Sequence, residues 1–102
     1  MTRDEINQAD RNTLNRLAAT EIMGFADYRG AFFPATNEVH AATCRRKIEE
    51  RGLEMEFTHA LWGVLNDDKP MLRGGFYAEL WRIANATPEQ IVRACLLAVC
   101  GE

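Results

Sequence analysis

The sequence of 102 residues lacks a long hydrophobic run and a marked excess of either charge sign. No stretch approaches the ~18 consecutive apolar residues that a membrane helix needs, so we expect no membrane partner and a soluble protein. The formal net charge of −3 is too small for a chain that binds nucleic acid chiefly by electrostatics or imitates a phosphate backbone. The length suits a single domain over residues 1–102.

Cysteine is scarce, with three residues at no repeated spacing. An odd number of this kind argues against a disulfide framework and predicts reduced thiols that pack as small hydrophobic side chains. The first ten residues are polar and acidic, whereas a secretory signal needs a basic end followed by an apolar run. We therefore expect a cytoplasmic protein.

Motifs that carry chemistry are also missing, because the sequence contains no GxxxxGK[ST], GxGxxG or CxxC pattern. His40 and Cys44 stand at i and i+4 and could offer two metal ligands, but no further spacing completes a site. Cys44 beside Arg45 is the one candidate nucleophile, and no third group is placed to orient a base. Three carboxylates could form a row on paired strands: Glu54, Glu56 and Glu79. The sequence predicts no enzyme, metal or cofactor.

What the sequence does contain is a well-marked unit over residues 36–61, on which we expect the other segments to pack. Thr36 or Asn37 can cap a helix over 37–51. Ala41, Cys44 and Ile48 recur at spacings of three and four and so share one face of that helix. Gly52 follows as the residue that ends it.

Two later segments read as strands. Leu53, Met55 and Phe57 alternate with polar residues, which predicts a strand near 53–61. A polar run predicts a chain reversal near 66–70, after which apolar residues alternate over 75–84 and predict a second, antiparallel strand. The segment 75–84 also fits a helix, since Phe76, Leu80 and Ile83 are spaced at i, i+4 and i+7.

Two more helices are expected, one at each end of the chain. The first runs over about 4–23, with Thr2 and Glu5 as a capping box and Gly24 as its end. The polar stretch 10–12 divides it, so residues 1–12 can form a frayed arm. The last runs over 88–99, where Thr87, Pro88 and Gln90 mark the start and a nearly unbroken apolar sequence predicts burial on most sides.

These elements together predict an α+β fold in which helices cover a small antiparallel β-sheet, as in an α/β/α sandwich. The alternative is an all-α helical bundle, which follows if 53–61 and 75–84 are both helices.

The segment 25–35 combines four aromatic residues with Gly30 and Pro34, which interrupt any regular period. Its aromatic side chains either fill the core from an irregular segment or form a contact surface. Because so short a segment offers few inward positions, we expect at least one aromatic to be exposed. The candidate partner-binding residues are Tyr28, Arg29, Phe32 and Phe33.

A basic cluster lies on the helix 37–51 and offers the alternative of nucleic-acid contact through phosphates. Its members are Arg45, Arg46, Lys47 and Arg51. Glu49 and Glu50 follow within one turn at spacings that favour ion pairs along the helix, and such pairing would leave the cluster as a solvated face.

Three stretches in this order, LNRLAATEIMGF, ATNEVHAATCRRKIEERGLEMEF and GGFYAELWRIANATPEQIVRACLLAV, resemble the phage ABA sandwich domain family. The resemblance covers roughly residues 13–100 and is clearest in the closing ATPEQIVRACLLAV. It implies an α/β/α fold and a phage or prophage origin, and it carries over no catalytic residues. The sequence departs from the family in the longer aromatic segment 25–35 and in the apolar ALWGVL.

The expected function is that of a small phage accessory protein that binds a host or defence-system protein, most concretely as an anti-CRISPR or other anti-defence inhibitor. The alternative is a phage regulatory protein that binds nucleic acid through the basic cluster.

Overall fold

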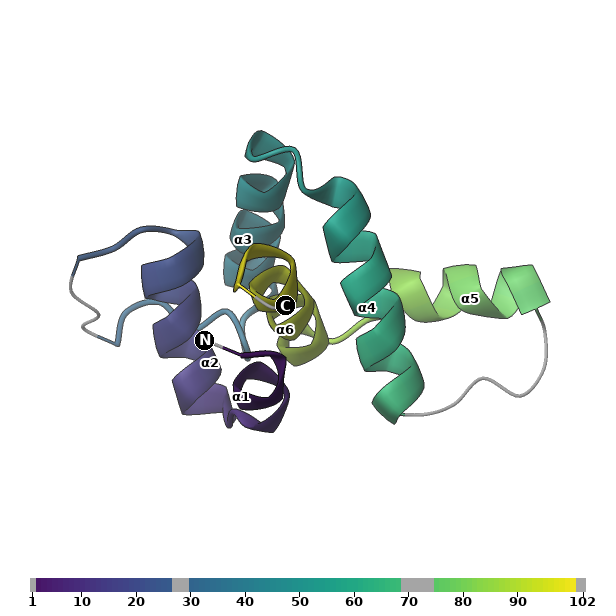
Figure 1. The fold of residues 1–102 in the computed structure, drawn as a ribbon, viewed down its shortest axis with the longest axis horizontal. Coiled ribbons are helices and arrows are strands. Elements are labelled where there is room, and N and C mark those ends of the chain that lie inside the picture. The colour runs from purple at the N-terminus through teal and green to yellow at the C-terminus, as the bar shows by residue number, and fades with distance from the viewer. Residues whose placement is uncertain (1, 27–29, 69–74, 101–102) are drawn as a thin grey trace.

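The computed structural model describes residues 2–26, 30–68 and 75–100, and the last helix, α6 (Pro88–Cys100), lies at its centre. Figure 1 shows α6 nearly end-on with the other helices around it. Five elements pack directly against it: α1 (Arg3–Gln8), α2 (Arg11–Leu17), the π-helical turn η1 (Ala18–Ile22), α3 (Glu38–Glu50) and α4 (Glu54–Asp68). The segment 36–61, which we expected at the centre, instead supplies α3 and most of the helix α4 beside it.

The sequence of α6 explains its central place. Thr87 and Gln90 form a reciprocal capping box, in which the backbone N–H of each donates to the other's side chain at 2.8 and 3.2 Å. Its buried residues lie on several faces of the helix: Val92, Ala94, Cys95, Leu96 and Leu97. The predicted helix over 88–99 and its burial are confirmed.

The helix α3 forms as the sequence predicts. The Asn37 side chain accepts hydrogen bonds from the N–H groups of Val39 and His40 at 2.9 and 3.1 Å. Gly52 ends the helix with φ of 70°. Its N–H and that of the next residue donate to carbonyls of the last turn at 3.0 and 3.1 Å, the pattern of a Schellman motif.

The predicted β-sheet is wrong, because the described residues form helices and no strand. The segment 53–61 lies in α4, where Phe57, Leu61, Val64 and Leu65 are buried at helical spacing. Met55, which alternation places with Phe57 on an inner sheet face, is 83% exposed. The 3.6-residue period over the whole helix outweighs five residues of alternation, and Glu, Met, Leu and Ala all favour helix.

The second predicted strand is also a helix, α5 (Gly75–Ala84). Ile83 packs against the core, while Leu80 is half exposed. The α+β class and the α/β/α sandwich implied by the family resemblance are therefore incorrect, and the all-helical alternative describes the fold. Asn66, Asp67 and Asp68, which we assigned to a chain reversal, belong to the end of α4, and residues 69–74 lie outside the description.

The single helix expected over 4–23 is divided into α1, α2 and η1. The break falls at Ala9, which has extended backbone angles, and Asp10 caps α2 by accepting from the N–H of Thr13 at 2.8 Å. This hydrogen bond lowers the pKa of the Asp10 carboxyl below its usual value. The expected stop at Gly24 is confirmed, with φ of 75°.

The helix α1 is docked on α6. Ile6 is fully buried, and the guanidinium of Arg93 donates to the carbonyl oxygens of Ile6 and Ala9, both at 3.3 Å, and to that of Asn7. Arg93, the one charged residue between Ile91 and Cys100, thus donates to carbonyls at the end of α1, of which that of Ile6 also accepts from the N–H of Ala9.

The helix α5 extends away from this bundle and packs chiefly against α4, as Figure 1 shows at the right. It helps to make the molecule elongated, with extents of 44 × 26 × 25 Å. The Arg82 side chain holds α5 to α4 by donating to the carbonyl of Leu65 and to Asn66 Oδ1. In the described part of the chain, no helix is long and apolar enough to span a membrane.

Candidate functional site

An aromatic cluster stands at the end of the molecule opposite α5, and we define it as Phe25, Phe32, Phe33 and His40. The rings of Phe25 and Phe32 meet edge to face with centroids 5.6 Å apart. His40, from the first turn of α3, lies 5.0 Å from the ring of Phe32 and 4.9 Å from that of Phe33. Phe25 is 43% exposed and Phe33 40%, so the expected exposure of aromatic residues in 25–35 is confirmed.

Residues 30–35, which carry Phe32 and Phe33, are irregular but held by hydrogen bonds. The N–H of Phe33 donates to Nδ1 of His40 at 3.1 Å. The N–H of Ala35 donates at 2.8 Å to Oδ1 of Asn15, the buried amide on α2. Pro34 between them is fully buried. The cluster is therefore fixed to α2 and α3 on both sides of the proline.

The sequence analysis did not predict that Asn15 and His40 accept the hydrogen bonds that hold this segment. A weak signal existed for Asn15, because it is a polar residue within the apolar stripe that includes Leu14 and Ala18. Of the four predicted partner-binding residues, the structure brings Phe32 and Phe33 together around His40. Tyr28 and Arg29 lie outside the described residues.

The basic cluster on α3 does not form a common cationic surface. Arg51 donates to the carbonyls of Glu21 and Ile22 at 3.3 and 2.7 Å and so closes the end of η1. Lys47 pairs with Glu50 at 3.2 Å. Arg45 places its guanidinium over the ring of Phe57, 5.8 Å from the centroid, and both Arg45 and Arg46 are exposed. Nothing in these contacts favours nucleic-acid binding over the expected binding of another protein.

The candidate nucleophile Cys44 is fully buried in the core. Burial raises the pKa of its thiol to about 12, so the nucleophilic thiolate is scarce at neutral pH. The pKa of the Cys95 thiol is raised as well, first by its own burial and then by the neighbouring Cys44. Within the described residues, no group of three or more side chains could hold a metal ion.

The carboxylate row that we considered depends on paired strands, and its basis is lost with them. Glu54 and Glu56 stand two residues apart in the first turn of α4, a spacing that points them in different directions on a helix.

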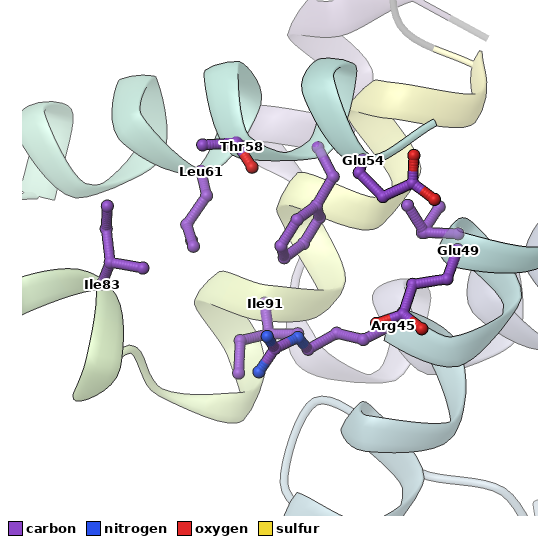
Figure 2. A pocket seen from close by; sticks show the side chains of 9 residues that line it. Arg45, Glu49, Glu54, Thr58, Leu61, Ile83 and Ile91 are labelled. Atoms are coloured by element: carbon purple, nitrogen blue, oxygen red, sulfur yellow. The ribbon is translucent and has the colours of Figure 1, made fainter. Parts of the chain in front are cut away.

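A second feature is a cleft between α3 and α4, which we call the α3–α4 cleft and which has a volume of about 170 Å³. Figure 2 shows the side chains that line it. Its floor is apolar and comes from four helices: Ile48, Phe57, Leu61, Ile83 and Ile91. Its rim carries exposed polar residues: Arg45, Glu49, Glu54 and Thr58.

The charges on this rim are separated. Figure 2 shows Glu54 of α4 and Glu49 of α3 on the right of the cleft and Ile83 on its left, while Arg45 extends along the lower edge toward Ile91. On α4, Glu54 and Thr58 also border a shallow hollow over Met55, His59 and Trp62. The cleft thus shares part of its rim with a hollow on the outer face of α4.

Comparison with known proteins adds no relative, because no protein-family model, no curated protein and no solved structure matches this chain. The resemblance to the phage ABA sandwich domain family stays a prediction from the sequence.

Proposed function

We propose that this chain acts by binding another protein and has no enzymatic activity of its own, and that the aromatic cluster is its contact surface. The observation that carries the proposal is that Phe25 and Phe33 expose about two fifths of their surface, 43% and 40%, while their backbone N–H groups are hydrogen-bonded to Ala19 and His40. Contiguous exposed apolar side chains are typical of sites where proteins meet.

The geometry favours tight binding because the backbone N–H groups of Phe25 and Phe33 are already hydrogen-bonded, to the Ala19 carbonyl and to His40 Nδ1. An interface pays less conformational entropy when its aromatic anchors are fixed before the partner arrives. Val39, next to His40, is 72% exposed and extends the apolar surface along α3. Tyr28 and Arg29, which belong to the same segment, remain part of the proposed contact, since tyrosine and arginine are enriched among residues that dominate binding energy.

The test combines partner capture with a double substitution. Tagged protein should recover a stoichiometric partner from a bacterial lysate, and Phe25→Ala with Phe33→Ala should weaken that complex by more than ~2 kcal/mol. Trp81→Ala is the matched control, because Trp81 is also an exposed aromatic, at 71%, but belongs to α5 at the other end. Equal affinity of the double variant and the wild type would rule the aromatic cluster out.

The partner we propose is a host or defence-system protein, and the specific form is inhibition of a CRISPR or other defence complex. The closing stretch ATPEQIVRACLLAV and the small size of the chain support this form. Expression of the chain in bacteria with an active CRISPR system should restore plaque formation by a targeted phage. Unchanged plaque numbers across several defence systems would separate the general binding function from this specific one.

A further inference from the structure

The α3–α4 cleft has the size of one large side chain. Its volume is about 170 Å³, and a protein cavity of about 150 Å³ lined by apolar side chains holds a benzene ring. Phe57, Leu61 and Ile48 form a closely packed floor that is less than a tenth exposed. An apolar anchor such as the side chain of leucine, methionine or phenylalanine would fill the cleft and lose its contact with water.

The two carboxylates on the rim of the cleft, Glu49 and Glu54, are not paired with Arg45, the cation on the same rim. Arg45 and Glu49 stand at i and i+4 on α3, a spacing at which an ion pair forms readily. Arg45 instead lies over the ring of Phe57. Among the described residues, neither Glu49 nor Glu54 has an ion-pair partner. Two carboxylates therefore remain available beside an apolar pocket.

We infer that the α3–α4 cleft is a second docking site, separate from the aromatic cluster, for a peptide segment of another protein with a large apolar residue next to lysine or arginine. The apolar side chain enters between Phe57, Leu61 and Ile83, and the basic side chain meets Glu49 and Glu54. Arg45, the only cation among the described residues that line the cleft, lies over Phe57 and leaves these carboxylates to a basic partner, while Glu49 and Glu54 themselves repel acidic segments.

The test is selection of binding peptides from a library of random short sequences displayed on phage, with the folded full-length protein as the target. The peptides that are enriched should carry a large apolar residue beside lysine or arginine. Glu54→Lys should weaken binding of a synthetic copy about tenfold or more, because the basic side chain would then face a like charge. Binding should also weaken at high salt.

Glu56→Lys is the matched control, since Glu56 stands in the same first turn of α4 but does not line the cleft. Both substitutions remove the same favourable interaction with the helix dipole, so only their effects on the site differ. A second variant, Thr58→Trp, tests the pocket without changing charge, because an indole at the rim would occupy the cleft and abolish binding.

Three results would overturn the inference. The first is that the selection enriches no peptide or enriches acidic ones, and the second is equal affinity of the Glu54→Lys and Glu56→Lys proteins for the peptide. The third is a concentration-dependent dimer that Glu54→Lys disrupts, since the occupant of the cleft would then be a second copy of the chain. The Phe25→Ala/Phe33→Ala protein should bind the peptide as the wild type does. This variant distinguishes failure of the cleft from failure of the aromatic cluster.

Discussion

Two side chains, Asn15 and His40, give the irregular segment 30–37 a fixed shape. Each accepts a hydrogen bond from a backbone N–H that has no place in a helix, those of Ala35 and Phe33. A buried donor left without an acceptor costs about 1–3 kcal/mol. The conformation of the aromatic cluster is thus specified by residues on α2 and α3, which the segment itself does not contain.

Cys44 makes the stability of the protein depend on alkaline pH. Burial raises the pKa of its thiol from 9.0 to about 12, so the unfolded chain loses this proton at lower pH than the folded one. The associated stability is complete below pH 9 and is lost as the pH rises toward 12. We expect the free energy of unfolding, measured with urea, to fall between about pH 9 and about pH 12.

Cys44→Ala provides the comparison, because this variant keeps every other titrating group. Its absolute stability is lower, since a buried side chain is shortened, but its free energy of unfolding should decline less steeply with pH than that of the wild type. Parallel pH profiles for the two proteins would mean that Cys44 is not protected from ionisation in the folded state.

At the scale of elements, replacing a glycine by alanine should have opposite effects on stability at two positions, Gly52 in the turn between α3 and α4 and Gly63 within α4. Gly52 has φ of 70° and Gly63 lies inside α4, and a Cβ atom at either position meets nothing within 4 Å. Gly52→Ala should destabilise the protein by about 1–2 kcal/mol, because the left-handed conformation strains an L-residue. Gly63→Ala should stabilise it by about 0.5–1 kcal/mol through helix propensity.

Thermal or urea unfolding of the two variants measures both effects. Since neither added methyl group contacts another residue, the difference between them reports backbone conformation alone. A Gly52→Ala protein as stable as the wild type would show that the α3–α4 turn does not require a left-handed residue.

The elements that could be predicted from the sequence are those whose signals are local. Asn37, Gly52, Thr87 and Gln90 cap helices through residues within four positions, and α3 and α6 were predicted accordingly. The strand predicted for 53–61 failed because a pattern of five residues gave no account of Leu61, Val64 and Leu65, whose burial depends on the distant α6.

The aromatic cluster and the α3–α4 cleft also differ in how far their residues could be predicted from the sequence. Sequence analysis could identify the aromatic residues of 25–35 because they are close together in the chain. It could not foresee the α3–α4 cleft, whose floor combines Ile48, Phe57, Ile83 and Ile91 from four helices. The way in which helices cross decides which residues face a shared cavity. No local pattern in the sequence indicates that crossing.

For the whole molecule, the structure predicts unequal local stability. The helix α6 is surrounded by five elements, whereas α5 rests chiefly on α4 and leaves Leu80 and Trp81 exposed. Amide hydrogens of residues 92–97 should exchange only through global unfolding, and those of 80–84 should exchange faster by about tenfold or more through local opening. Hydrogen exchange followed by NMR or mass spectrometry measures both, and equal protection of α5 and α6 would contradict this account.

The central position of α6 also has a consequence for the order in which the protein is made. A ribosome completes α1 to α5 before it adds residues 88–100, so the apolar faces of the earlier helices emerge without the helix that they cover. Contacts such as that between Arg93 and the carbonyl of Ile6 join residues 87 positions apart, and such closures come late because their entropy cost precedes any gain. The growing chain therefore acquires its core only once α6 has followed the helices that it contacts, and until then those faces are exposed to whatever else in the cell binds apolar surface.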